Sequence, residues 1–206
     1  MIDEQFQFFL DEFGPQIERR EVPPSSLARY QGRLPDQLMK YWQEFGWSGY
    51  ADGLLWIVNP QEYEGVLSEW LSDSKFEGID SFHVIAVGAF GKLHVWGEKY
   101  GSAFTLVASE SLLSPQQDFS VLPKNMDFEL RCFFMSEQRN YIDTYGLFDQ
   151  AHIRLGGLNS GEIYGFHPAL ALGGPVAVEN LQKVSAVEHL SFLVQLEELS
   201  VLRLPD

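Results

Sequence analysis

Residues 162–174 read Glu-Ile-Tyr-Gly-Phe-His-Pro-Ala-Leu-Ala-Leu-Gly-Gly, and the rest of the fold is predicted outward from them. Proline disfavours a helical conformation in the residue before it, so the chain is expected to bend at the His167-Pro168 bond. The glycine pair at 173–174 then permits a further turn. We therefore predict a strand, a bend and a turn, with no helix, and with Tyr164 and Phe166 in the core. The alternative is an exposed ligand-binding corner formed by these two aromatic residues and the histidine.

Helices are predicted on both sides of this stretch. Residues 147–155 have a helical pattern that two glycines end, and residues 185–199 predict a final helix with an apolar inner face. Residues 127–135 are ambiguous, because their apolar side chains alternate as in a strand. The shortage of β-branched residues favours a helix there, with Asp127 as a possible cap.

The N-terminal half predicts helices followed by a sheet. Asp3 can cap a first helix that Gly14 ends, and a second helix is predicted over residues 35–45 and a third after residue 60. Residues 16–33 are expected to form a loop with one short helical turn. Strands are predicted at residues 53–58, 82–88, 92–96 and 103–107, the last three as an antiparallel meander. The apolar side chains of the first helix recur at helical spacing: Phe6, Phe9, Leu10 and Phe13.

These patterns predict the fold class and a division into domains. The fold is expected to be α+β, with a mainly antiparallel sheet and packed helices followed by a smaller, helix-rich α+β C-terminal domain. Residues 114–123 are the least patterned part of the chain. The predicted domains are accordingly residues 1–112 and 113–206.

Composition sets limits on the class of protein. The chain has 206 residues, of which 45% are hydrophobic and 14% aromatic, enough for a sizeable core. No apolar run reaches the roughly 18 residues of a membrane-spanning helix, and acids near Met1 replace the basic start of a secretion signal. The chain is therefore expected to be cytoplasmic. Cys132 is the single cysteine, so no intrachain disulfide and no multi-cysteine metal site is possible.

The net charge is −15, from 29 acidic and 14 basic residues. A field of this sign repels phosphate backbones, so neither direct nucleic-acid binding nor binding to an anionic membrane is expected. A basic partner is favoured instead. The alternative is that the acids serve solubility alone.

The sequence contains no pattern typical of an enzyme. Five histidines, at positions 83, 94, 152, 167 and 189, include no His-Glu-x-x-His motif. His83 and His94 can face each other across a hairpin, although two partly buried structural histidines are favoured. Cys132, among aromatic residues, is interpreted as an inert core thiol. We expect no catalytic residue, no cofactor and no metal.

A family resemblance is carried by residues 162–174 and the segment after them. Together with Asn-Leu-Gln-Lys-Val at 180–184 and the apolar residues around His189 and Leu190, they resemble the C-terminal domain of a bacterial family that has a GAD-like domain at its N-terminus. The helices and meander of the N-terminal half resemble that GAD-like domain. The run at 34–46 is also similar to immunity modules of the Smi1/Knr4 type.

This resemblance implies an immunity protein that neutralises a DNase toxin delivered by type VI secretion. It implies a cytoplasmic antitoxin, monomeric or in a 1:1 heterodimer with the toxin's basic nuclease domain. Toxin contacts are expected where six acids meet one lysine between residues 62 and 80, although an ordinary solvated face remains the alternative. The candidate contact residues are Glu62, Glu69, Asp73, Glu77 and Asp80.

Two other classes of function remain open. One is a scaffolding or regulatory module that binds some other basic protein. The other is a hydrolase assembled around a divalent metal from scattered histidines and acids.

Overall fold

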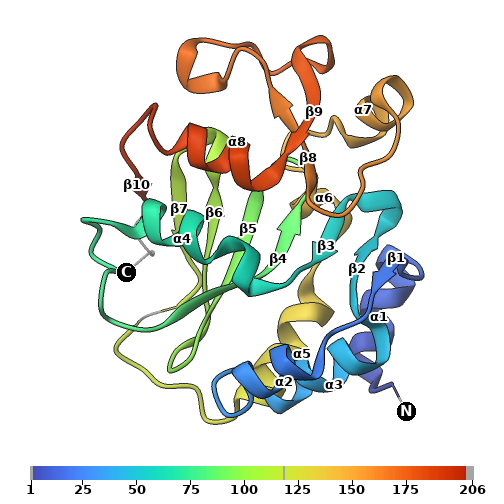
Figure 1. The fold of residues 1–206 in the computed structure, drawn as a ribbon, viewed down its shortest axis with the longest axis vertical. Coiled ribbons are helices and arrows are strands. Elements are labelled where there is room, and N and C mark those ends of the chain that lie inside the picture. Colours follow the sequence, from blue (N-terminus) through green and yellow to red (C-terminus); the bar gives the residue numbers. More distant parts are fainter. Residues whose placement is uncertain (1, 118, 203–206) are drawn as a thin grey trace.

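An eight-stranded sheet runs through the molecule, as the computed structural model of residues 2–117 and 119–202 shows (Figure 1). Successive strands pair antiparallel, except that the last strand pairs parallel with β7. In spatial order they are β1 (Ile17–Arg20), β2 (Trp47–Tyr50), β3 (Leu55–Ile57), β4 (Phe82–Gly88), β5 (Lys92–Gly97), β6 (Gly101–Val107), β7 (Leu112–Pro115) and β10 (Ser200–Val201). The predicted α+β class with a mainly antiparallel sheet is confirmed.

Helices cover both faces of this sheet. One face carries α1 (Glu4–Phe13), α2 (Pro24–Tyr30), α3 (Asp36–Phe45) and α5 (Met126–Ser136), and the other carries α4 (Glu64–Leu71) and α8 (Ala186–Leu193). The pleat of β5 decides which side chains meet which helices: Leu93 and Val95 join the core under α4 and α8, whereas Trp96 joins the core under α5. The sheet therefore separates two hydrophobic cores.

The core under α5 is built from aromatic rings. The Phe6 ring stacks on Tyr41 at 4.0 Å between centroids and meets Phe134 edge-on at 5.3 Å. Asp3 fixes this arrangement, since its Oδ1 accepts a hydrogen bond from the Phe6 N–H at 2.9 Å and its Oδ2 accepts one from the Tyr41 hydroxyl at 2.6 Å. The predicted N-cap of α1 is confirmed, and the same carboxylate joins α1 to α3.

A smaller segment packs on the edge of these cores. It contains α6 (Arg139–Ile142), α7 (Phe148–Leu155) and a separate antiparallel pair, β8 (Glu162–Phe166) and β9 (Leu181–Ser185). Short 3₁₀ turns complete the chain: η1 (Ala51–Gly53), η2 (Pro60–Tyr63), η3 (Ala108–Glu110), η4 (Leu170–Leu172) and η5 (Val178–Asn180).

The stretch at 162–174 has the predicted strand, bend and turn, but the prediction that it contains no helix is wrong, because Leu170–Leu172 form the 3₁₀ turn η4. It forms β8, bends at a cis His167-Pro168 bond and turns through η4. Tyr164 and Phe166 are buried, and the Tyr164 N–H donates to the Ala89 carbonyl at 2.7 Å, which docks β8 onto the sheet. The core assignment of both aromatic residues is therefore confirmed.

Several predictions about local structure are wrong. The segment at 16–33 contains a strand, β1, besides the predicted helix, and β2, β7, β9, β10 and α6 were not predicted. The cap of α5 is Asn125, whose Oδ1 accepts from the Phe128 N–H at 3.0 Å, while Asp127 instead accepts from the Gln37 N–H at 2.9 Å. The last helix ends at Leu193, because the chain then turns to place β10 beside β7.

The unpatterned stretch at 114–123 begins inside β7, and its residue 118 lies outside the described residues. The division into domains at residue 112 stays a prediction. Among the described helices, none is both long enough and apolar enough to cross a bilayer.

Candidate functional site

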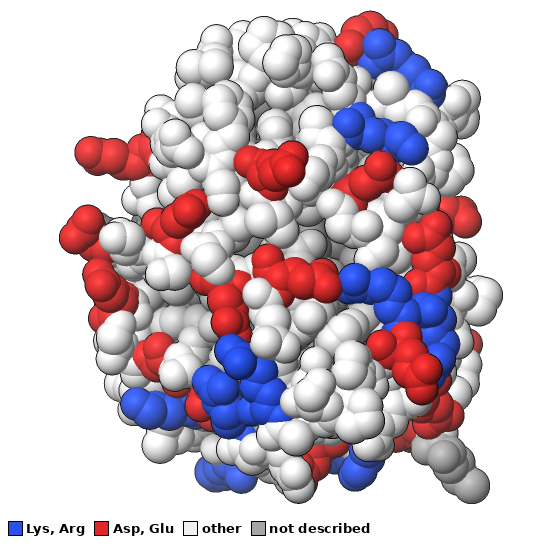
Figure 2. Space-filling model, viewed as in Figure 1, with Lys and Arg blue, Asp and Glu red and all other residues white. Residues whose placement is uncertain are grey.

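The five predicted contact acids follow one another along one side of the molecule. Glu62 lies in η2, Glu69 lies in α4, and the other three lie in the loop between α4 and β4. Figure 2 shows acidic side chains distributed over this side, with several basic groups among them. We call the segment from Glu62 to Asp80 the acidic segment.

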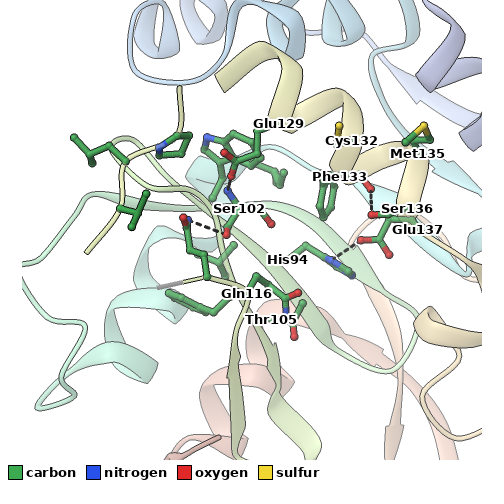
Figure 3. A pocket seen from close by; sticks show the side chains of 18 residues that line it. His94, Ser102, Thr105, Gln116, Glu129, Cys132, Phe133, Met135, Ser136 and Glu137 are labelled. Atoms are coloured by element: carbon green, nitrogen blue, oxygen red, sulfur yellow. Dashed lines mark hydrogen bonds and ion pairs between the residues drawn. The ribbon is translucent and has the colours of Figure 1, made fainter. Parts of the chain in front are cut away.

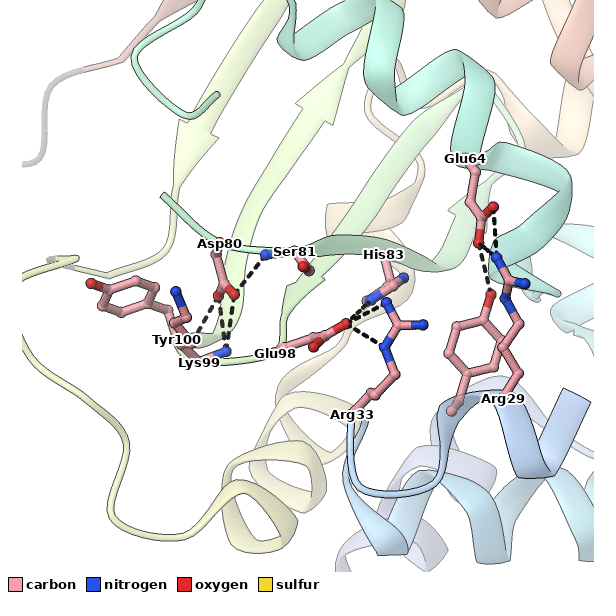
Figure 4. Close-up of polar contacts among 10 residues, drawn as sticks. Arg29, Arg33, Glu64, Asp80, Ser81, His83, Glu98, Lys99 and Tyr100 are labelled. Atoms are coloured by element: carbon pink, nitrogen blue, oxygen red, sulfur yellow. Dashed lines mark hydrogen bonds and ion pairs between the residues drawn. The ribbon is translucent and has the colours of Figure 1, made fainter. Parts of the chain in front are cut away.

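Two of these acids hold the loop itself. Asp80 accepts hydrogen bonds from the backbone N–H groups of Ser81 at 2.7 Å, Lys99 at 2.9 Å and Tyr100 at 3.1 Å, and so ties the loop to the turn between β5 and β6 (Figure 4). Glu77 Oε2 accepts from the Asp73 N–H at 2.9 Å. Both carboxylates therefore have structural roles.

Arginines of the N-terminal part neutralise a further two acids. Arg20 forms a two-pronged pair with Glu62 at 3.0 and 3.2 Å, and Arg29 binds the neighbouring Glu64 at 2.8 Å (Figure 4 shows the second pair). The Arg20 and Glu62 side chains are each 39% exposed, so such pairs contribute little to stability. Within the described part of the chain, the exposed Glu69 carboxylate has no such partner.

A second candidate site lies on the opposite face of the sheet and was not predicted. It is a cavity of about 620 Å³ between β5, β6 and α5, closed on one side by the chain that continues from β7 (Figure 3). The wall is apolar in part, from the side chains of Ile85, Trp96 and Phe133. Its polar and charged lining includes His94, Ser102, Thr105, Gln116, Gln117, Glu129, Ser136 and Glu137.

His94 and Glu137 face each other at one end of this cavity. His94 Nδ1 lies 3.4 Å from Glu137 Oε1, and the two side chains are only 3% and 12% exposed. Burial, helped by the nearby Lys92 charge, lowers the pKa of His94 to about 3. Burial raises the pKa of Glu137 to about 7, although the same lysine opposes that rise. The contact therefore joins a neutral imidazole to a carboxyl group close to its midpoint at neutral pH, and is no permanent ion pair.

The buried imidazole is left unsatisfied. Apart from the 3.4 Å contact of Nδ1 with Glu137, neither ring nitrogen of His94 has a hydrogen-bond partner in the described part of the chain. Buried polar atoms without partners cost free energy, on the order of 1–3 kcal/mol each. A ligand that supplied a partner would recover part of that cost.

The other end of the cavity holds a second carboxylate. Glu129 accepts from the Ser102 N–H at 2.7 Å, and burial raises its pKa. Cys132 also lines the cavity and is half-buried, so the prediction of an inert core thiol is wrong about its position. The rim carries large apolar side chains that water reaches: Val121 is 64%, Leu122 62% and Met135 43% exposed.

The two strand histidines do not form a pair. His83 is registered opposite Trp96, whereas His94 is opposite Ala86 on the same hairpin. His83 Nε2 instead contacts Glu98 Oε1 at 2.8 Å, a carboxylate that Arg33 also binds (Figure 4). In residues 2–117 and 119–202, no group of three or more His, Cys, Asp or Glu side chains is placed to hold a metal ion. The hydrolase alternative therefore lacks a ligand set in those residues.

Sequence reasoning missed the cavity because its lining comes from five separate segments: β4, β5, β6, the chain after β7, and α5 with the residue that follows it. The usable signal was alternation along β5: if Leu93 and Val95 point to one core, His94 and Trp96 point to the other, toward α5. Glu129, in the first turn of α5, and Glu137, directly after its end, are then charged candidates on the facing helix.

Comparisons with known proteins identify both halves of the chain. Residues 4–110 match the GAD-like domain, and residues 127–197 match the domain described as T6SS immunity protein Tdi1, C-terminal. None of the curated proteins matches the sequence. The fold is similar to that in the crystal structure of Atu4351 from Agrobacterium tumefaciens, with a TM-score of 0.84 and 22% identity over 95% of this chain and 91% of that one. The GAD-like match spans more than half of the sequence, so the chain belongs to the GAD-like domain family, and it carries the C-terminal domain of the T6SS immunity protein Tdi1 behind it.

Proposed function

We propose that this protein is the antitoxin of an antibacterial DNase delivered by type VI secretion, which it binds and inhibits in a 1:1 complex. The observation that carries the proposal is the succession of a GAD-like domain and a Tdi1-type C-terminal domain on one chain. An immunity protein acts by binding its cognate effector, so a protein partner is implied directly. The DNase activity of that partner is our inference.

Charge supports a nuclease as the partner. A DNase must present lysine and arginine side chains to hold DNA phosphates. A chain with a net charge of −15 is attracted to such a surface over long range, and its carboxylates compete with DNA for the same groups. Inhibition then results from occupation of the DNA-binding surface, with no chemical step.

Within the acidic segment, we assign the first contacts to the carboxylates that are free to meet a cation. Glu69 and Asp73 are exposed, and in the described residues neither carboxylate is engaged. Glu62 would have to exchange Arg20 for a toxin cation. Glu77 and Asp80 hold the loop that presents Asp73, so their contribution to binding is partly one of positioning.

An interface also needs apolar anchors, because charge steers association more than it holds a complex. The acidic segment has such residues close by. The ring of Phe119, in the chain that continues from β7, packs against Phe76 in the loop of the acidic segment and Phe82 in β4, at 5.3 and 6.3 Å between centroids. Two positions further on, the exposed Val121 and Leu122 begin the cavity rim. One partner can therefore meet carboxylates and apolar side chains around the same end of the sheet.

The test is co-expression with candidate secreted DNases, scored by survival of the host and by calorimetric binding at low and high salt. We expect rescue, and tight binding that weakens as salt is raised. The double charge reversal Glu69→Lys with Asp73→Lys should slow association. The matched control is Glu179→Lys, an exposed acid in η5 away from this segment.

Failure to bind any nuclease, with no rescue, would contradict the DNase assignment. Capture of a basic protein that is not a nuclease would instead support the scaffolding alternative. If the variant with both charge reversals still rescues the host and binds as fast as the wild type, the antitoxin function stands and the acidic segment is not part of the interface.

A further inference from the structure

The cavity between β5, β6 and α5 is acidic inside and apolar at its rim. Glu129 lies in the first turn of α5 and Glu137 directly follows the last residue of that helix, eight positions later; the same number of helical positions spans about 12 Å. Among the described residues that line the cavity, there is no lysine and no arginine. Lys92, two positions before His94, donates a hydrogen bond from its ammonium to the Tyr141 carbonyl at 2.7 Å, and its charge also acts on Glu137 without a direct ion pair among the described residues.

The polar groups at the inner end are arranged as acceptors. Glu137 ends α5 next to His94, whose imidazole is neutral and has a lone pair on one ring nitrogen. Apart from that contact of Nδ1 with Glu137, both His94 nitrogens lack hydrogen-bond partners in the described part of the chain, although the side chain is only 3% exposed. A donor-rich cation supplies two contacts that this end lacks among the described residues: a direct ion pair for the carboxylate, which Lys92 does not make, and an N–H group for the imidazole lone pair.

The walls fit the stem that carries such a cation. Phe133, on α5 between the two carboxylates, presents its ring to the cavity, 5.5 Å from the His94 ring between centroids (Figure 3). Arginine and lysine bury their methylene stems along surfaces of this kind while the charged head reaches polar groups. A metal ion is not supported, since no group of three ligating side chains occurs in the described residues.

We propose that this cavity is a receptor for one arginine or lysine side chain of a partner protein, with Glu137 and His94 as its inner contacts and Glu129 at its outer end. The exposed Val121, Leu122 and Met135 favour a protein over a free small cation, because only a protein surface would cover the rim as well. The inference rests on the proposed function for the identity of that partner, the toxin. The cation preference itself does not depend on it.

The experiment uses the full chain and no toxin. Uniformly ¹⁵N-labelled protein at pH 8, where Glu137 is ionised, is titrated with Nα-acetyl-arginine amide and, separately, with the neutral isostere Nα-acetyl-citrulline amide. A probe of this size is expected to bind with a dissociation constant on the order of 1 mM. Backbone shifts should change along β5, β6 and α5, and the citrulline probe should bind about tenfold more weakly, as expected for loss of a charge-assisted contact.

Two variants locate the contact. Glu137→Gln should weaken the arginine probe about tenfold. The matched control Glu188→Gln, an exposed acid on α8 across the sheet, should leave it unchanged. Thermal melting of both variants without probe checks that each is folded, and the comparison of the two probes on the wild type needs no variant.

Equal binding of the charged and neutral probes would overturn the proposal. So would shifts outside the cavity, or the absence of binding at about 20 mM probe, well above the expected dissociation constant. Each of these outcomes leaves the antitoxin function standing. Conversely, if this protein binds the arginine probe but binds no nuclease, the proposal of a cation-binding cavity stands and the toxin is the wrong partner.

Discussion

The two faces of the sheet place their carboxylates in opposite settings. On the α4 side, Glu69 is exposed to water, where a charge costs little and acts over long range. On the α5 side, Glu137 is only 12% exposed, and burial raises its pKa to about 7. Exposed acids can serve solubility as well as the attraction of a basic partner. Burial of a carboxylate costs free energy, so a buried carboxyl group indicates a specific contact. The burial of a carboxylate, more than the number of acids nearby, therefore distinguishes a candidate contact residue from an ordinary surface acid.

The largest effect on stability is expected from a substitution in the aromatic core that anchors α5. Phe134→Ala removes a fully buried ring that meets Phe6, Phe9 and Tyr41 edge-on, and should cost about 3–5 kcal/mol of unfolding free energy. Phe128→Ala, on the same helix but 53% exposed, is the matched control and should cost less than about 1 kcal/mol. Urea unfolding measures both. Similar losses for the two variants would mean that α5 is not anchored by this aromatic core.

Substitution of the buried Glu137 is expected to give the next largest effect. Because its pKa is raised, the sign of its contribution to the pH dependence of stability is known. Between pH 4.5, the ordinary value for an unfolded chain, and about pH 7, the folded protein keeps the Glu137 proton that the unfolded chain has lost. Stability therefore falls as pH rises through this range, by about 1.4 kcal/mol per pH unit for one proton. Glu137→Gln should remove this loss and be more stable than the wild type by about 3 kcal/mol at pH 8, with little difference at pH 4.

His94 contributes the opposite slope at lower pH. Its pKa is lowered from 6.5 to about 3, so the unfolded chain holds a proton that the folded state does not, and stability rises with pH across that range. Where the two ranges overlap, from about pH 4.5 to 6.5, the slopes of His94 and Glu137 cancel. Urea unfolding of wild type and Glu137→Gln from pH 4 to 8 isolates the Glu137 contribution. Parallel curves would show that Glu137 is ionised in both states, and would remove the contrast between the two faces.

The same contrast explains what could be predicted from sequence. Long segments such as α1 and α3 can be predicted from the helical spacing of their apolar residues, and Asp3 indicated the start of the first helix. Short strands such as β7 and β10 depend on their neighbours in the sheet, β6 for the first and the distant β7 for the second, and four or two residues carry no strand pattern of their own. The acidic segment was found because its acids are close in sequence. Glu137 and His94 lie on separate elements, and their burial follows only from the packing of α5 on β5.

The smallest effect separates two acids within the acidic segment. Asp80→Ala removes the acceptor for three backbone N–H groups, of Ser81, Lys99 and Tyr100, and should cost about 1–2 kcal/mol of unfolding free energy. Glu69→Ala, on the exposed face of α4, should change stability by no more than about 0.5 kcal/mol. Urea unfolding at pH 7 compares them. If Asp80→Ala is as mild as Glu69→Ala, the loop does not need its carboxylate, and Asp80 is as free as Glu69 to meet a partner's cation. If Asp80→Ala costs more, as the three hydrogen bonds predict, any loss of toxin binding in that variant reflects a loosened loop. Substitutions of Glu69 and Asp73 then report on the interface itself.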